Sequence, residues 1–307
     1  MAFTTNTMWV ARNLKGMSCF DVNAPDKPVL IRDFPADAIQ PMHIQVVENR
    51  WLVIADRFRG LVVWDTGKSS DHPTSVSCEA YPAGSPTYLA LATVDGRRLA
   101  LVTLAGDGIA TYDITDLARP TLVARFSRGI DFSRRACVAG QRVFLADSSY
   151  GGLKVLDLTS TGSLEPEYEI HLFGMCESVV AAGSTLYVGY RGQGLRVLDF
   201  PGGMTSGTLP RVRSWQVRTR SRTRDLLATG NLLIVPNDEF GVELYQTDGK
   251  KLPRLVDEVE ADGPDSAAQS ASIYKNTVYV ASWESGVKVF RITGRKGRVE
   301  ELEIGER

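Results

Sequence analysis

The sequence has few of the residues that usually carry metal or cofactor chemistry. It contains three histidines (His43, His72, His171) and four cysteines (Cys19, Cys78, Cys137, Cys176). No two cysteines form a CxxC pair, and each lies in an apolar run typical of a strand. This pattern favours small buried thiols in a reducing compartment over a disulfide framework or a metal site. We therefore expect a cytoplasmic protein with no metal and no cofactor.

Longer-range signals are absent as well. No run approaches the roughly 18 apolar residues of a membrane span, and the first residues show no basic segment followed by an apolar core, so no membrane association is expected. We find no GxSxG, no Walker A motif, no GxGxxG opening a helix and no EF-hand spacing. The net charge is −1 for 307 residues, which gives no global field to attract nucleic acid.

One stretch departs from this charge balance. Residues 211–224, RVRSWQVRTRSRTR, contain six arginines. An anion or nucleic-acid contact is one interpretation, with Trp215 available to stack on a base. The other is an exposed outer strand, where charge blocks edge-to-edge aggregation. The alternation of Arg with Val, Ser and Thr favours the outer strand, and only Arg224 is assigned to the candidate site described below.

A repeat covers the whole chain. The phrases GLVVWD from Gly60, GIATYD from Gly108 and GLKVLD from Gly152 are variants of one motif. Aligned on the glycine, the chain has seven copies, with spacings of 44, 48, 44, 42, 47 and 45 residues. The seven glycines are Gly16, Gly60, Gly108, Gly152, Gly194, Gly241 and Gly286. Periods of about 40–50 residues with strand-like runs are typical of a β-propeller.

Each repeat holds four strand-like runs separated by turn residues. One follows the glycine and two precede it, joined by tight turns such as Glu48-Asn49. A fourth, as in VLIRDF (29–34), TLVARF (121–126) and RLVDEV (254–259), follows a proline that suits the start of an edge strand. The sequence therefore predicts an all-β, seven-bladed β-propeller with four-stranded antiparallel blades, as a single domain over residues 1–307. The first blade has too few residues before Gly16 for a full innermost strand.

The repeat phrase, G-L-x-V-x-D followed by a proline and an outer strand, resembles that of the LVIVD-repeat family of β-propellers. The resemblance extends over essentially the whole chain. It implies the fold, and it implies no particular activity, because propellers serve as binding modules and as enzymes.

Candidate functional residues lie where the innermost strands begin, at one mouth of the expected central channel. Alignment on the repeat glycine puts six polar or amphipathic residues at equivalent positions: His43, Tyr88, Arg134, Glu177, Arg224 and Gln269. The loops before the glycine add Tyr190, Arg191 and Trp283 on the same face.

Two roles are open for these residues. Arg134 and Arg224 could clamp a carboxylate or phosphate, and His43 and Glu177 could serve as acid and base. In that case Tyr88 and Tyr190 would donate hydrogen bonds. Alternatively, the mouth is polar because it is solvated, and Glu177 forms a structural salt bridge with Arg134 or Arg224.

Two classes of function follow. The first is a binding or interaction protein that holds a small anionic molecule or a protein partner at the channel mouth, with nucleic acid disfavoured. The alternative is a metal-independent enzyme for a small molecule, such as a lyase, isomerase, cyclase or hydrolase.

Overall fold

The computed structural model describes most of the chain. The described residues are 1–67, 72–81, 83–148, 152–171, 174–201, 203–205, 207, 211–217, 219, 222–247, 252–260, 267–282, 286–293 and 298–302. They form 28 strands in seven antiparallel sheets of four strands each. The fold class is all-β with seven four-stranded blades in a propeller arrangement, as predicted from the repeat.

The chain divides into two compact units. Unit 1 comprises residues 1–24 and 28–171, and unit 2 comprises residues 25–27 and 172–307. We describe each unit by itself, and the single domain over residues 1–307 stays a prediction. Within the described residues, the one helix is the 3-10 turn Asn13–Lys15, and no helix is long and apolar enough to cross a membrane.

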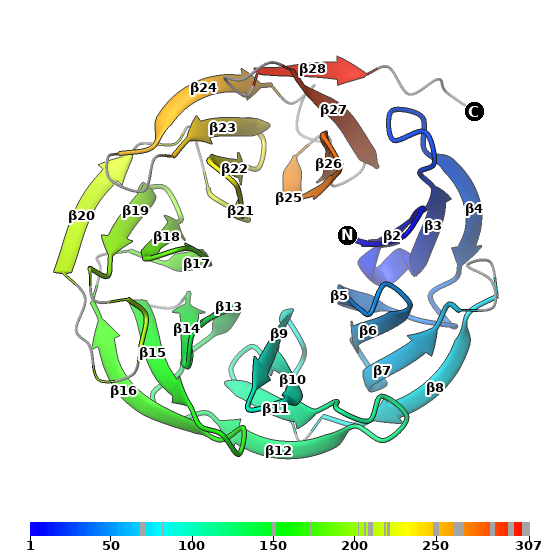
Figure 1. Cartoon of the computed structure of the whole chain (residues 1–307), viewed down its shortest axis with the longest axis horizontal. Coiled ribbons are helices and arrows are strands. Elements are labelled where there is room, and N and C mark those ends of the chain that lie inside the picture. The colour runs from blue at the N-terminus through cyan, green and yellow to red at the C-terminus, as the bar shows by residue number, and fades with distance from the viewer. Residues whose placement is uncertain are drawn as a thin grey trace. The chain divides into compact units, whose positions relative to one another are not determined.

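Unit 1 holds the first four blades. Their strands are β1 (Ala2–Thr4), β2 (Thr7–Ala11), β3 (Met17–Asp21) and β4 (Val29–Phe34); β5 (Pro41–Val47), β6 (Trp51–Asp56), β7 (Gly60–Asp65) and β8 (Thr74–Glu79); β9 (Tyr88–Val94), β10 (Arg97–Thr103), β11 (Ile109–Asp113) and β12 (Thr121–Phe126); β13 (Ser133–Ala139), β14 (Arg142–Asp147), β15 (Gly152–Leu158) and β16 (Leu164–Ile170). In each blade the strands pair in chain order, from the inner strand to the outer one (Figure 1).

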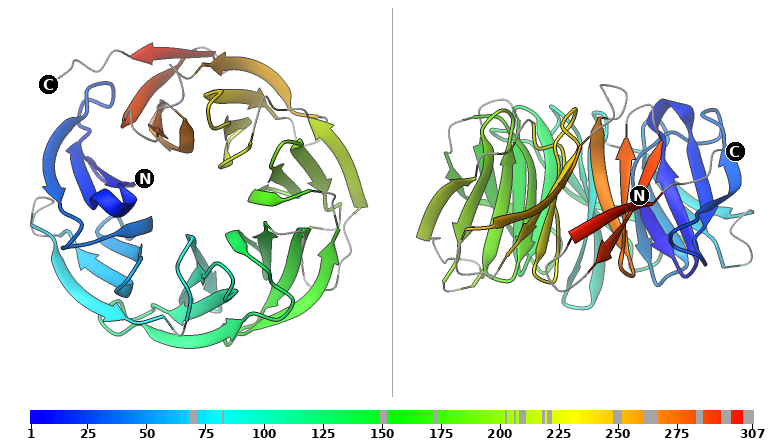
Figure 2. Two further views of the ribbon diagram at one scale, coloured as in Figure 1. Left: turned by 180° about the vertical axis from the view of Figure 1, so that it is seen from behind. Right: turned by 90° about the horizontal axis from the view of Figure 1, so that it is seen from above.

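Unit 2 holds the last three blades. Their strands are β17 (Cys176–Ala182), β18 (Thr185–Tyr190), β19 (Gly194–Asp199) and β20 (Arg211–Val217); β21 (Leu227–Thr229), β22 (Leu232–Pro236), β23 (Val242–Gln246) and β24 (Arg254–Val259); β25 (Ala268–Tyr274), β26 (Thr277–Ser282), β27 (Val287–Thr293) and β28 (Arg298–Leu302). The strands of a blade turn progressively, so that the outer strand runs obliquely to the inner one (Figure 2).

The outer strands confirm the proline signal. β4, β12 and β24 have the bounds expected from the sequence, and each begins just after Pro28, Pro120 or Pro253. The shortened first blade is confirmed too, because β1 has three residues where β5 has seven. The arginine-rich stretch supplies β20, which is the outer strand of its blade as predicted.

The repeat glycine makes a turn in a left-handed conformation that disfavours other residues. All seven repeat glycines have positive φ, for example +102° at Gly60 and +83° at Gly108. A Cβ at Gly60 would overlap the carbonyl oxygen of Glu79, and one at Gly108 would overlap that of Phe126, both in the outer strand of the same blade. Gly60 and Gly108 therefore serve both the turn and the close approach of the outer strand.

The core lies between neighbouring blades. The second strands are almost entirely buried, as in β6, because a sheet covered on both faces carries apolar residues on both. In unit 1, one apolar cluster joins Val53 and Leu61 of the second blade to Leu89 and Val102 of the third. In unit 2, another joins Tyr187 and Val197 to Leu233. Within each unit, neighbouring blades therefore hold one another in place by packing.

Candidate functional site

Each blade has two ends, which we name by their turns. The glycine-turn end holds the repeat glycine and the start of the inner strand. The hairpin end holds the turn between the inner and the second strand. The described residues predicted to carry function lie at the glycine-turn ends, and their contacts differ between the two units.

In unit 2, an arginine–carboxylate cluster joins three blades at their glycine-turn ends. Its members are Glu177, Arg191, Arg222, Arg224, Asp238 and Gln269. Four of them are predicted site residues, and the structure adds Arg222 and Asp238.

Glu177 is the buried centre of the first half of this cluster. Its side chain is 3% exposed and both of its carboxylate oxygens accept from guanidinium groups. Arg191 donates to Oε1 from Nε at 2.9 Å, and Arg222 donates to Oε2 from Nη2 at 2.7 Å. The sequence analysis considered Arg134 or Arg224 as the partner of Glu177, and the structure shows ion pairs of Glu177 with Arg191 and Arg222. A carboxylate engaged on both oxygens orients the two arginines and is poorly placed to transfer a proton.

Asp238 is the centre of the second half. Its Oδ2 accepts from Nε of Arg224 at 2.9 Å, and its Oδ1 accepts from Nε2 of Gln269 at 3.2 Å. Asp238 has φ +53°, a left-handed conformation that Asp tolerates better than most residues. Its carbonyl oxygen also accepts from the backbone N–H of Ala268 at 2.8 Å, which ties the sixth blade to the seventh.

The segment Arg222-Thr223-Arg224 explains why two arginines reach two different carboxylates. Thr223 is fully buried against Gly189, where any Cβ would overlap the side chain of Thr223. Thr223 separates the two arginines, which lie one on each side of it in the chain. Arg222 then reaches Glu177 of the fifth blade and Arg224 reaches Asp238 of the sixth. The interpretation that only Arg224 of the arginine run reaches the site was therefore wrong.

The cluster carries a surplus of positive charge. Three arginines and two carboxylates give a formal charge of +1. Arg191 is the most accessible member at 43% exposed, and Arg224 is 26% exposed. A guanidinium has five N–H donors in a fixed plane, so arginines that are held in place by carboxylates can still bind an anion from solution.

In unit 1, the predicted residues form a stack between blades instead. The rings of His43 and Tyr88 lie 4.0 Å apart between centroids, and the guanidinium of Arg135 lies 4.6 Å from the Tyr88 ring centroid. Arg134, the predicted residue, packs against the ring of Phe132 at 5.1 Å. Burial lowers the pKa of His43 well below its ordinary value, and the positive charges of the amino terminus and Arg135 lower it further. Its Nδ1 is buried and has no hydrogen-bond partner among the described residues.

A β-bulge explains why the six residues predicted at equivalent positions of the inner strands do not all occupy the same position. Arg134, Glu177 and Gln269 are each the extra residue at a register shift in the inner strand. In the second blade the extra residue is Met42, so His43 lies one position further on. β9 has no bulge. Its Tyr88 pairs with Thr103, and His43 pairs with Ala55. Thr103 and Ala55 are equivalent, because each pairs with the residue that follows the repeat glycine of its blade. His43 and Tyr88 therefore share the position of Arg135, and their placement beside Arg134 was wrong by one residue.

Two further predicted residues need comment. Tyr190 is the last residue of β18 and is fully buried, and this burial raises its pKa. Its hydroxyl is therefore withdrawn from solvent and cannot reach a ligand at the surface, contrary to prediction. Trp283 lies outside the described residues.

All four cysteines are free thiols, and no group of three or more His, Cys, Asp or Glu among the described residues could hold a metal ion.

The comparisons with known proteins show the fold. No protein-family model matches the chain, and no curated protein matches it either. Among solved structures, a Bacteroides fragilis protein with a provisional assignment as a 6-phosphogluconolactonase aligns with a TM-score of 0.76 at 11% identity, over 97% of this chain and 93% of its own. The periplasmic gluconolactonase of Pseudomonas aeruginosa aligns with a TM-score of 0.76 at 15% identity, over 97% and 96%. The computationally designed protein Ika8 aligns with a TM-score of 0.64 at 16% identity, over 98% and 85%.

These likenesses show a shared propeller fold and no more, because the identities are low. The resemblance to the LVIVD-repeat family is not confirmed by any family model.

Proposed function

We propose that this protein is a metal-independent hydrolase of a small anionic lactone or ester, and that it holds its substrate at the arginine–carboxylate cluster. The observation that carries the proposal is the set of three guanidinium groups oriented by Glu177 and Asp238. The likeness to propellers that are named gluconolactonases supports hydrolysis over the other reactions of the predicted enzyme class.

The reaction needs little from the protein beyond binding and charge stabilisation. Water attacks the lactone carbonyl carbon, the carbonyl oxygen takes up negative charge, and the ring C–O bond breaks. The leaving oxygen takes a proton, and the product is a hydroxy acid that releases a proton to solution. Guanidinium N–H groups of Arg191, Arg222 and Arg224 would bind the substrate's anionic group or the oxyanion. Glu177 would orient Arg191 and Arg222, a different role from the predicted acid or base.

The test is a proton-release assay with glucono-δ-lactone and its 6-phosphate as substrates. Arg191→Ala and Arg224→Ala should each lower kcat by about 100- to 1,000-fold, the range for loss of one oxyanion donor. Arg125→Ala is the matched control, because it removes an ion pair of similar exposure, Arg125 with Asp107, from unit 1. Full activity in both site variants would contradict the proposal. Failure of the wild type to hydrolyse both substrates would also contradict it.

A second candidate is binding without turnover, of a small anion or of an acidic side chain of a partner protein. It is favoured by one observation: the predicted acid and base are both withdrawn, since Glu177 is paired on both oxygens and Nδ1 of His43 is buried. Gluconate or its 6-phosphate would then raise Tm in the wild type and not in Arg224→Ala, with no proton release from the lactones. A ligand at 100 times its Kd adds about 2.7 kcal/mol to stability.

Two further features are part of the proposal. We assign the chain to the LVIVD-repeat propellers on the repeat phrase alone, and we place the protein in the cytoplasm because its four cysteines are free thiols.

A further inference from the structure

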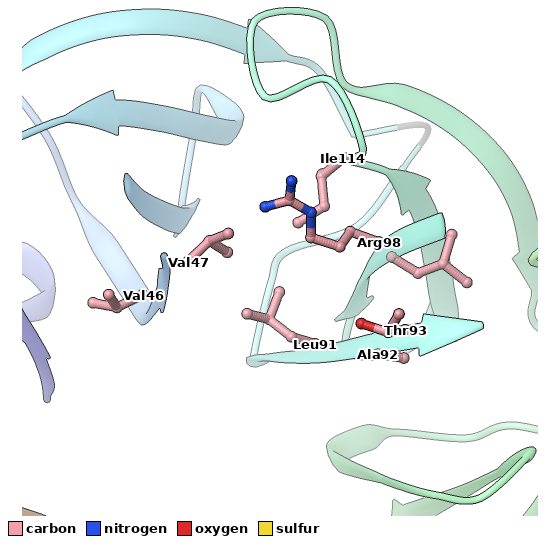
Figure 3. A pocket seen from close by; sticks show the side chains of 8 residues that line it. Val46, Val47, Leu91, Ala92, Thr93, Arg98 and Ile114 are labelled. Carbon is pink, nitrogen blue, oxygen red and sulfur yellow. The ribbon is translucent and has the colours of Figure 1, made fainter. Parts of the chain in front are cut away.

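A cavity lies in unit 1, lined by residues that take no part in the arginine–carboxylate cluster. It is formed between the second and third blades at their hairpin ends and has a volume of about 250 Å³ (Figure 3). Val46, Val47, Leu91, Leu99 and Ile114 supply most of its wall. Apolar walls with a single charged group are the kind of lining that small-molecule sites share.

The cationic group is Arg98, at the start of β10. Its backbone is held on both sides, because its N–H donates to Oγ1 of Thr115 at 3.0 Å and its carbonyl oxygen accepts from Ile114 N–H at 2.8 Å. Its guanidinium faces the space between Val47 and Leu91 (Figure 3). Nη1 lies 2.7 Å from Oε1 of Glu48 on the second blade. This contact lacks hydrogen-bond geometry, so the buried Nη1 has no hydrogen-bond partner among the described residues.

Comparison of the repeats shows that Arg98 is specific to its blade. The carbonyl oxygen of Arg98 accepts from the backbone N–H of Ile114, which follows Asp113 at the end of the third strand. An equivalent backbone hydrogen bond is present in every blade. The seven residues are Asn6, Arg50, Arg98, Gln141, Ser184, Asn231 and Asn276. Five are uncharged, and Arg50 pairs with Asp65 of its own blade at 2.6 Å. Among these seven described residues, Arg98 is the one whose side chain forms an ion pair with a neighbouring blade.

We propose that this cavity binds a small apolar monocarboxylate, with the carboxylate on Arg98 and the apolar body against Val47, Leu91 and Ile114. The volume equals that of about eight water molecules, at about 30 Å³ each in the liquid. It therefore fits a short-chain or single-ring acid.

Glu48 acts as a built-in competitor for this site. Its carboxylate already lies against Arg98, as a ligand carboxylate would. Its side chain is 58% exposed, and it lies in a tight hairpin turn with φ +51°. An ion pair this exposed contributes little stability, so the Glu48 side chain can swing into solvent when a ligand arrives.

The experiment is a titration of methyl-labelled protein with sodium benzoate, followed by NMR at the Val46, Val47, Leu91, Leu99 and Ile114 methyl groups. Benzamide is the neutral probe of the same shape. Benzoate should shift these methyl signals saturably, and benzamide should bind at least about tenfold more weakly because it lacks the charge-assisted bond. Glu48→Gln should tighten benzoate binding by about threefold, the effect of removing an exposed competing charge.

Arg98→Gln should weaken benzoate binding by at least about tenfold. Arg97→Gln is its matched control, since Arg97 pairs with Asp113 on the same blade and does not line the cavity. Leu91→Trp keeps the charge and fills the cavity, so it should also abolish binding. The proposal is overturned if benzoate produces no saturable shift, if benzamide binds equally well, or if Arg98→Gln binds as the wild type does. Loss of binding in Arg97→Gln would likewise overturn it.

Discussion

His43 is the residue whose protonation state the fold controls most clearly. It is the one histidine packed inside a blade interface, against the Tyr88 ring and within the field of Arg135. Burial lowers its pKa well below the ordinary value, so the folded protein holds a neutral imidazole at neutral pH. In the unfolded chain the same ring takes up a proton below about pH 6.5.

This difference predicts an acid-sensitive fold. The unfolded state binds more protons than the folded state below about pH 6.5, so the free energy of unfolding should fall as the pH is lowered from 7 to 5. The contribution of His43 is at most about 1.4 kcal/mol per pH unit. Urea unfolding at several pH values would measure it. His43→Gln should show a shallower loss over this range, and a loss as steep as that of the wild type would contradict the assignment.

At the scale of the element, the glycine turn of the second blade lets the outer strand approach closely. Gly60 combines a φ of +102° with a predicted overlap between a Cβ and the Glu79 carbonyl oxygen. Gly96 is a natural control in a hairpin turn, because it has φ +80° and open space around it. The two glycines therefore separate the conformational effect from the steric one.

Gly60→Ala should destabilise the protein by at least about 3 kcal/mol, since the outer strand must move as well as the turn. Gly96→Ala should cost about 1–2 kcal/mol, the price of a left-handed residue alone. Urea unfolding monitored by tryptophan fluorescence would give both values. Equal losses in the two variants would show that the contact with the outer strand has no effect on stability.

At the scale of the whole molecule, the charge distribution argues against nucleic-acid binding. The net charge is −1, and the arginine run lies partly in the outer strand β20 and partly in ion pairs of Arg222 and Arg224. Fluorescence anisotropy with a labelled single-stranded DNA at about 0.15 M salt should show no saturable binding below about 10 µM protein. Saturable binding that weakens steeply with added salt would instead assign the run to a nucleic-acid surface.

The sequence alone determined the architecture of this protein. The repeat glycines, the prolines before outer strands and the alternation of apolar residues are local signals, and each acts within one blade. They predicted seven four-stranded blades, the bounds of β4, β12 and β24 and the short β1. They also placed Glu177, Arg191, Arg224 and Gln269 at the glycine-turn ends of unit 2, where the structure joins them in one cluster.

Only the tertiary structure decided which side chains meet. The extra residue Met42 in β5 and the absence of a bulge in β9 put His43 and Tyr88 at the position of Arg135, and an alignment on the repeat glycine does not locate a bulge inside a strand. Glu177 pairs with Arg222, 45 residues away and in a segment that the sequence assigned to an outer strand. Contacts between blades depend on packing across the interface, as at Thr223 and Gly189, and no pattern within one repeat encodes them.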